Sequence, residues 1–424
     1  MSSEVAVYVA VGERNVPAGR LTFDSGGGAA ASFAYDHGYL AGPEAYQLDP
    51  VLPLVSGPLP TGPGRVTFGA FADSAPDGWG RSLIRRAELA RAEAEGEAAR
   101  PVGELDVITA VRDDLRQGAL RYRHGEEGLF LAAAAPGVPA LADLPGLLEA
   151  AARVERDAAG HADLELLLWA GGSIGGWRPK VHFADAAGRA AIAKFPKVGS
   201  DAWDVMAWEK VAHDLARAAG ISLPESELIR VGDAHVFIVT RFDRRGGARV
   251  GYASARTMLN AGYGDQRSYL EIAEVIEERS PAATSDLREL WRRVAFSILI
   301  SNTDDHLRNH GFLHVRADAW TLSPAFDLNP NPGPGRKHLS TAIDLADTSA
   351  SVDTLMRVAG HFRLDTSAAL GVLAEVTRAV SGWRGVAVSH GLRPADLDGM
   401  EPAFEHAESE RARALTASRP GHLA

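Results

Sequence analysis

The sequence predicts an α+β protein in which a β-rich N-terminal region precedes a helical C-terminal lobe. Val5, Val7 and Val9 alternate with other residues and are followed by a turn and by 21–23, which is typical of a β-hairpin. After residue 252, apolar residues recur every three or four positions, most clearly from Asp286 to Ile300, which indicates helices. A chain of 424 residues is too long for one hydrophobic core, so several domains are expected.

The composition excludes several classes of protein. The net charge is -11 and the pI is about 5.7, which argues against nucleic acid as the main ligand. The chain has no cysteine, so disulfides, thiolate metal sites and cysteine nucleophiles are excluded. The N-terminus lacks the pattern of a signal peptide, and Pro and Gly interrupt the longest apolar stretch, 129–151. We therefore expect a cytoplasmic protein that makes no membrane contact.

Composition changes along the chain suggest where domains begin and end. A solvated helix is expected over 82–99, ended by Pro101, and a connection broken by Gly and Pro follows. The tail is charged and Ala-rich, which fits either a frayed helix or disorder. The expected parts are an N-terminal β-rich subdomain (1–125), a connection (126–164), a nucleotide-binding part (165–245), a helical catalytic lobe (246–404) and a tail (405–424).

The middle of the chain alternates between strands and a helix. An apolar run, 166–170, leads into a glycine-rich segment, 171–176, and then into a hairpin formed by 178–184 and 189–195. A helix is expected over 204–219, because its apolar positions are spaced by three and four and Gly220 follows. The next strand is expected at 235–242.

The segment most informative about chemistry lies between residues 301 and 331. The chain has six asparagines, and four of them fall between 302 and 331. Transfer of a phosphoryl group from ATP needs a carboxylate near the acceptor hydroxyl and oxygen ligands for Mg²⁺ nearby. Asp304 and Asn309 have the five-residue spacing of the kinase catalytic loop, and Asp327, which follows Phe326, suits the second metal-binding carboxylate.

Taken alone, this segment is equally compatible with helix caps and turns. The preceding half of the chain favours the kinase interpretation, because a glycine-rich run, a strand lysine (Lys194) and a helix glutamate (Glu209) follow in the order that a kinase requires. Each also has an ordinary explanation as a flexible loop, a snorkelling lysine or a surface charge. Trp177 stands where a P-loop would need its lysine, so a P-loop NTPase is disfavoured.

These residues resemble the HipA family over most of the chain. The stretches that carry the resemblance are 173–180 (Ser-Ile-Gly-Gly-Trp-Arg-Pro-Lys), 193–196 (Ala-Lys-Phe-Pro), 219–224 (Ala-Gly-Ile-Ser-Leu-Pro), 240–244 (Thr-Arg-Phe-Asp-Arg), 302–312 (Asn-Thr-Asp-Asp-His-Leu-Arg-Asn-His-Gly-Phe), 324–327 (Pro-Ala-Phe-Asp) and, near the N-terminus, 76–81 (Pro-Asp-Gly-Trp-Gly-Arg).

The resemblance implies a bilobal protein-kinase-like fold and a protein Ser/Thr kinase that uses ATP and Mg²⁺. It implies that Asp304 is the catalytic base and that Asn309 and Asp327 bind the metal. The glutamate partner of Lys194, Glu209, is our own assignment. The residues expected at the nucleotide are Gly175, Gly176, Trp177, Arg178, Pro179 and Lys180 in the phosphate loop, Lys194, Glu209, a hinge formed by Thr240, Arg241 and Phe242, and His306, Asn309, Phe326 and Asp327.

The family also implies regulation and partners. Ser173 aligns with the loop serine that HipA proteins autophosphorylate, and phosphate there would add charge beside ATP. Members are toxins that act on protein substrates such as aminoacyl-tRNA synthetases. A helix-turn-helix antitoxin, HipB, neutralises them and supplies the contact with DNA. The alternatives left open are a small-molecule or lipid kinase and a non-catalytic nucleotide-binding partner of a helix-turn-helix repressor.

Overall fold

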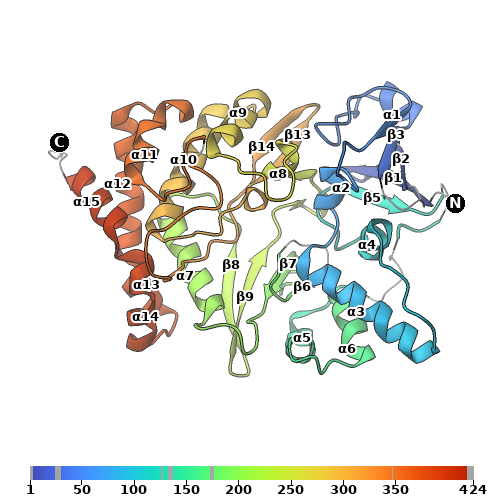
Figure 1. Ribbon diagram of the computed structural model, residues 1–424, viewed down its shortest axis with the longest axis horizontal. Helices are drawn as coiled ribbons and strands as arrows, with labels where there is room; N and C mark the ends of the chain where they lie inside the picture. The colour runs from blue at the N-terminus through green and yellow to red at the C-terminus, as the bar shows by residue number, and fades with distance from the viewer. Residues whose placement is uncertain are drawn as a thin grey trace. The chain divides into compact units, whose positions relative to one another are not determined.

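The computed structural model describes residues 3–23, 30–125, 128–131, 137–171, 176–345 and 347–417. It is a mixed α/β structure, as predicted, and Figure 1 shows its elements. The chain divides into two compact units. The first comprises Met1–Asp201, Ile229–Gly262 and Leu313–Asp318, and the second comprises Ala202–Leu228, Tyr263–Phe312 and Ala319–Ala424.

The N-terminal part of the first unit is built on a five-stranded antiparallel sheet. Its strand order is β4-β3-β2-β1-β5. The strands are β1 (Ser3–Val11), β2 (Arg14–Phe23), β3 (Ala31–Tyr35), β4 (Pro58–Pro60) and β5 (Leu120–Arg123). Val5 pairs with Leu21, which confirms the predicted first hairpin. Short helices accompany the sheet: α1 (His37–Ala41), α2 (Gly69–Asp73) and α4 (Glu104–Ala110).

A second core in the same unit lies between helices and another sheet. That sheet has the order β6-β7-β9-β8, with β6 (Lys180–Ala184), β7 (Ala190–Lys194), β8 (Ser226–Val231) and β9 (Ala234–Thr240). Three helices pack on it: α3 (Gly78–Glu95), α5 (Leu144–Glu155) and α6 (His161–Ala170) (Figure 1). Trp79, Leu147, Leu167 and Phe183 are among the buried residues that join these elements into one cluster. The predicted hairpin 178–195 is therefore confirmed.

The predicted helix over 82–99 needs correction at both ends. The helix found there, α3, begins at Gly78 and ends at Glu95, because Gly96 adopts a left-handed conformation (φ +67) and its N–H closes the last turn. Pro101 therefore does not end the helix. The remaining elements of this part are the 3₁₀ turn η1 (Leu141–Asp143), β10 (Arg244–Arg245), β11 (Ala248–Arg249), β12 (Tyr252–Ser254) and α8 (Ala255–Met258).

The second unit is mainly helical and is organised around α10 (Ala283–Leu299). Every residue of α10 from Leu290 to Leu299 is buried, and the helix packs against neighbours that include α9 and α12 (Figure 1). The other elements of this part are α7 (Val205–Ala218), α9 (Tyr269–Arg279), η2 (Leu307–Asn309), β14 (Ala319–Leu322), α11 (Val352–Arg357), η3 (Ala359–Phe362), α12 (Thr366–Ser381), α13 (Trp383–Ser389), α14 (Pro394–Phe404) and α15 (Ala407–Ala417), while β13 (Gly311–Arg316) has its first two residues here and the rest in the first unit. The charged tail therefore contains a helix.

No helix within the described ranges is both long enough and apolar enough to cross a membrane.

An aromatic cluster holds α7 against the C-terminal helices of the second unit. The rings of Trp383 and Phe404 stack with centroids 4.7 Å apart, and Trp208 lies 6.0 Å from Trp383. All three side chains are buried, and Trp383 Nε1 donates to Glu405 at 3.1 Å.

We predict that Trp383→Ala lowers the free energy of unfolding by about 3–5 kcal/mol, because it opens a cavity between packed aromatic rings. Urea denaturation measures this, with Trp383→Phe as a control that should lose less because a ring remains. A loss below about 1 kcal/mol for the alanine variant would show that the cluster does not hold these helices.

Candidate active site

Of the glycine-rich segment 171–176, the structure describes Gly171 and Gly176. Residues 172–175, which include the predicted Ser173 and Gly175, lie outside the described residues. Gly176 has φ +106, a conformation that side chains disfavour, and a Cβ atom there would lie 2.8 Å from Lys180 Nζ. Glycine is therefore required at 176, and the ammonium group of Lys180 lies directly beside its backbone.

Lys180 and Lys194 face each other across the β6–β7 hairpin. The two residues are cross-strand partners, and each is only 8% exposed. Residues directly opposite each other in an antiparallel pair extend toward the same face of the sheet. Both lysines therefore bring positive charge to one face of this sheet. Both lysines were predicted at the nucleotide from the sequence.

The other predicted loop residues have different roles in the structure. Arg178 forms two hydrogen bonds with the carboxylate of Asp201, at 2.6 and 3.0 Å, and Asp201 also accepts from the Lys197 N–H. The Arg178 guanidinium thus closes the turn after β7. Trp177 is 70% exposed, and the Pro179 carbonyl accepts from the Phe195 N–H at 2.9 Å.

The predicted hinge follows the end of β9. Thr240 is the last residue of the strand, and the Arg241 N–H still donates to the Ala190 carbonyl of β7 at 2.9 Å. Phe242 is half-buried, with its ring 6.3 Å from that of Tyr252. The Arg241 side chain is 6% exposed and points into the protein, so only its backbone is available for the role predicted at the hinge.

A buried network of charges holds the Arg241 side chain. Its guanidinium donates to Asp243 Oδ1 at 2.9 Å and Oδ2 at 2.6 Å, and to the carbonyls of Leu115 and Arg116. Asp243 also accepts from Arg244 and from the Gly118 N–H. Burial alone would raise the pKa of Asp243, but the two guanidinium groups outweigh it and hold that pKa well below its ordinary value.

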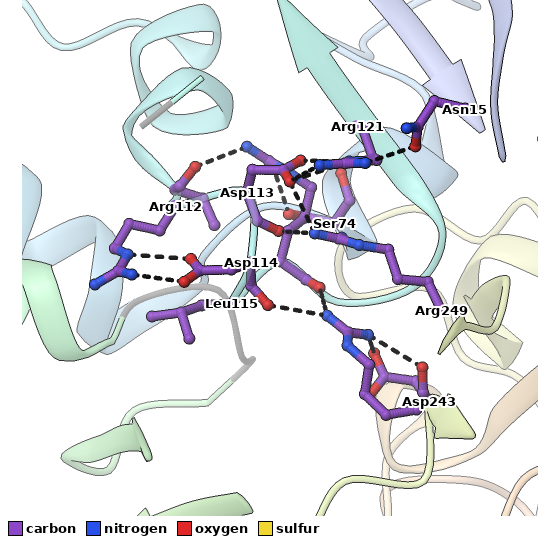
Figure 2. Close-up of polar contacts among 12 residues, drawn as sticks. Asn15, Ser74, Arg112, Asp113, Asp114, Leu115, Arg121, Asp243 and Arg249 are labelled. Atoms are coloured by element: carbon purple, nitrogen blue, oxygen red, sulfur yellow. Dashed lines mark hydrogen bonds and ion pairs between the residues drawn. The ribbon is translucent and has the colours of Figure 1, made fainter. Parts of the chain in front are cut away.

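The same network continues through the loop before β5. Arg121 and Arg249 both pair with Asp113, and Arg112 forms a bidentate pair with Asp114, as Figure 2 shows. Arg116 is 1% exposed, and its guanidinium donates to three backbone carbonyls. The hinge strand is therefore tied to a loop more than 120 residues earlier in the sequence.

We predict that Asp243→Asn lowers the free energy of unfolding by about 3–5 kcal/mol at neutral pH, because it leaves Arg241 and Arg244 buried without their counter-charge. The lowered pKa means that the ionised carboxylate stabilises the fold fully above the ordinary Asp pKa of about 3.9. This contribution is lost as the pH falls toward the lowered value. The difference in the free energy of unfolding between wild type and Asp243→Asn should therefore become smaller below about pH 4.

Denaturant unfolding between pH 3 and pH 7 tests this, with Asp157→Asn as the control. Asp157 pairs with Arg86 at the surface, where its side chain is 79% exposed, so its loss should leave stability nearly unchanged. Equal effects of the two substitutions would contradict a buried role for Asp243.

In the second unit, the candidate catalytic segment begins where α10 ends. The chain reverses at Ser301, whose φ of +54 is rare outside glycine, and the Asn302 N–H returns to the Ser297 carbonyl at 2.8 Å. Asn309 lies on η2, and its Nδ2 donates to the Asp304 carbonyl at 3.0 Å. Because this bond uses only the amide nitrogen, the Asn309 carbonyl oxygen remains available for a ligand.

The two adjacent aspartates have opposite environments. Asp305 is 4% exposed and accepts from the Tyr269 hydroxyl at 2.7 Å and the Ser297 hydroxyl at 3.0 Å. His310 Nε2 also lies 3.0 Å from its carboxylate. Burial would raise the pKa of Asp305, but these partners outweigh it, and the pKa is lowered. Asp304 instead lies at the surface, so it is the aspartate open to a reactant.

Asp327 adds a second carboxylate near Asp304. Partial removal from water raises the pKa of Asp304, and the charges of Asp327 and Asp305 raise it further, against the lowering effect of His306. Asp327 has φ +60, which costs of order 1–3 kcal/mol outside glycine and is typical of functional positions. Its Oδ1 accepts from Asn329 Nδ2 at 3.4 Å. Phe326 and His306 are half-buried beside these residues in the sequence.

A later segment is hydrogen-bonded onto this loop through Thr303. Asn331 Nδ2 donates to the Thr303 hydroxyl at 2.8 Å, while the Ser340 N–H and hydroxyl both donate to its carbonyl. The Thr341 hydroxyl donates to the Asp305 carbonyl at 2.7 Å. Residues 329–341 are thereby held against the catalytic segment within the same unit.

The oxygen donors of Asn309 and Asp327 fit Mg²⁺, which prefers carboxylate and carbonyl oxygens and normally keeps water and phosphate ligands as well. Within the described ranges, no three or more His, Asp or Glu side chains gather in a way that could hold a metal ion. Mg²⁺ often binds one or two protein oxygens together with substrate phosphates, which is what these two side chains could offer.

The predicted residues fall in both units. Gly176, Trp177, Arg178, Pro179, Lys180, Lys194, Thr240, Arg241 and Phe242 lie in the first unit, and Glu209, Asp304, His306, Asn309, Phe326 and Asp327 lie in the second. Glu209 is 1% exposed, so it is not the surface charge that the sequence left possible. Its assignment as the partner of Lys194 stays a prediction.

Sequence reasoning missed the residues that support the site. Tyr269 and Ser297 gave no signal, because their partner Asp305 is distant from Tyr269 in sequence and one of many polar residues near Ser297. The stretch 240–244 was identified, but its contacts with Leu115, Arg116 and Gly118 were not. Asn331 could have been found, since it belongs to the asparagine cluster between 302 and 331.

The α+β fold of this chain is also found in a solved toxin–antitoxin complex. A chain of the Shewanella oneidensis complex of the toxin–antitoxin proteins HipA and HipB with operator DNA superposes with a TM-score of 0.67 at 16% identity, covering 98% of this chain and 100% of that one. A model for the HipA-like C-terminal domain matches residues 172–383, and a model for the HipA N-terminal domain matches residues 9–110. The chain belongs to the HipA family.

Two curated proteins are similar over a shorter region. "Putative kinase Y4dM" of Sinorhizobium fredii is 30% identical over 129 residues, which cover 27% of this chain and 31% of that protein. A Haemophilus influenzae protein described in the same way is 26% identical over 129 residues, 27% of this chain and 38% of its own. The match thus spans about a third of the length of these relatives.

Proposed function

We propose that this chain is an ATP-dependent protein Ser/Thr kinase of the cytoplasm that acts as the toxin of a toxin–antitoxin pair. The observation that carries the proposal is the contrast between Asp304 and Asp305. One carboxylate is buried among hydroxyl donors and anchors the loop, while its neighbour is left open beside Asn309 and Asp327. A kinase catalytic loop needs such an arrangement of one free carboxylate beside metal-binding oxygens.

In this mechanism Asp304 orients the acceptor hydroxyl and accepts its proton. The acceptor oxygen forms a bond to the γ-phosphorus, the bond from that phosphorus to the β–γ bridging oxygen breaks, and ADP leaves with that oxygen. The raised pKa of Asp304 makes it a better proton acceptor. Mg²⁺, held by Asn309 and Asp327, supplies charge neutralisation at the phosphates when it is bound. We infer that Lys180 and Lys194, which are cross-strand partners, bind phosphate oxygens of ATP.

The partners follow from the family and from the Shewanella complex. We propose that a helix-turn-helix antitoxin binds this chain and makes the contact with DNA, which suits a toxin with a net charge of -11. A protein such as an aminoacyl-tRNA synthetase is the proposed substrate.

We predict that Asp304→Asn lowers the rate of phosphoryl transfer by about 10²–10⁴-fold, because the variant loses its proton acceptor, while its melting temperature stays nearly unchanged. Asp305→Asn is the matched control: it should lower the melting temperature, because it weakens the anchor of three donors. Transfer from ATP to a candidate protein, followed by mass spectrometry, measures the first effect. Undiminished transfer by Asp304→Asn would refute the assignment.

We further predict autophosphorylation at Ser173. Incubation of the purified chain with Mg²⁺ and ATP should add one phosphate to the peptide that contains Ser173, and both Ser173→Ala and Asp304→Asn should abolish that addition. Phosphate there adds about -1.5 to -2 charges to the glycine-rich segment, and this charge should repel the phosphates of ATP, so the modified chain should bind ATP more weakly. A phosphate that persists in Ser173→Ala would place the modification elsewhere.

A further inference from the structure

The segment Pro76–Arg81 takes no part in the proposed mechanism, but the side chains of Trp79 and Arg81 fix it firmly in the fold. The Trp79 ring is 6% exposed and belongs to the core shared by α3, α5 and α6. The Arg81 guanidinium forms two hydrogen bonds with Glu104, at 2.8 and 2.6 Å, and a third to the Pro76 carbonyl at 3.0 Å. The start of α3 is therefore a fixed support.

This support holds Gly176 by two reciprocal hydrogen bonds. The Trp79 N–H, one of the free amides at the start of α3, donates to the Gly176 carbonyl at 3.1 Å, and the Gly176 N–H donates to Asp77 Oδ2 at 3.3 Å. Asp77 occupies the N-cap position, but its side chain makes no capping bond to its own helix. Gly176, about a hundred residues later, thus completes the cap that Asp77 would ordinarily supply.

Trp177, the residue after Gly176, packs closely against the start of α3. A Cβ atom on Gly78 would lie 2.5 Å from Trp177 Cδ2 and within 3 Å of two further ring atoms. The indole therefore rests directly on the backbone of Gly78, although Trp177 is otherwise 70% exposed. Gly78 is thus needed for space, because any side chain would push the ring away.

We propose that Pro76–Arg81 positions the phosphate-binding end of the glycine-rich segment, and with it Lys180, for nucleotide binding. The inference rests on the proposed kinase function. The physical link is short: Lys180 Nζ lies beside the backbone of Gly176, so a shift of Gly176 moves the surface against which that ammonium group sits. Asp77 and Gly78 are positioning residues in this role, since they act on the nucleotide through Gly176 and Trp177.

The test is Gly78→Ala, with Gly146→Ala as the matched control. Both glycines are in helices, but a Cβ at Gly146 meets nothing within 4 Å. In Gly78→Ala the amide exchange of residues 176–181, measured by hydrogen–deuterium exchange, should rise at least about tenfold, because the Gly176 bonds open. The dissociation constant for Mg²⁺–ATP should rise by about tenfold as well, while the control matches wild type in both.

Combining Gly78→Ala with Trp177→Ala tests whether the effect on nucleotide binding comes from the contact between these two residues. Trp177→Ala removes the ring that the new Cβ strikes, and it touches an exposed residue, so the variant should fold. If Gly78→Ala acts through this contact, the double variant should bind nucleotide no more weakly than Trp177→Ala alone. Additive losses would overturn the proposal, as would unchanged exchange in Gly78→Ala or faster exchange without a loss of affinity.

The outcomes separate the two proposals. Wild-type chain that binds no Mg²⁺–ATP would refute the kinase function and this inference with it. Wild-type binding that Gly78→Ala leaves unaltered would refute only the positioning role. Should Gly78→Ala not fold, Asp77→Ala removes the acceptor of the Gly176 N–H and is subject to the same two measurements.

Discussion

A charged side chain that is buried away from water needs hydrogen-bond donors or opposite charges around it, and this constraint shapes the candidate residues' surroundings in each of the two units. Asp305 in the second unit and Asp243 in the first are each buried, and each gathers donors from segments far apart in sequence. Removing one partner from such a group leaves an uncompensated charge, which is far more costly than losing a surface pair. The backbone that carries each aspartate is therefore confined, so the residues beside it are positioned.

A confined backbone matters in the second unit, because the residues around Asp305 adopt arrangements that cost free energy. Asp304 lies near two other carboxylates, and Asp327 has a left-handed backbone. Neither arrangement would persist in a loosely held loop, because each relaxes when the chain moves. Both occur in the segment where the proposed reaction needs a free carboxylate and metal-binding oxygens.

The local elements were predictable because their causes are local. The spacing of apolar residues predicted α7 and α10 to within a few residues, and the alternation in β1 predicted its pairing with β2. The end of α3 was predicted wrongly, because Gly96 closes the helix before Pro101 is reached. The asparagine cluster indicated the candidate catalytic segment for the same kind of reason, since four of the six asparagines are concentrated in one short stretch.

The sequence alone determined the family, the fold class and the segment in which the chemistry was to be sought, since these depend on residue types and on short spacings. The spacing to Asn309 selected Asp304 as the candidate base, but the sequence did not show that Asp305 is buried, and it gave no partner for Asp77, Asp113 or Asp243. Those assignments depend on burial and on contacts between residues such as Tyr269 and Asp305, or Asp77 and Gly176. Only the folded chain brings such residues together, so only the tertiary structure decided which carboxylate is an anchor and which is free.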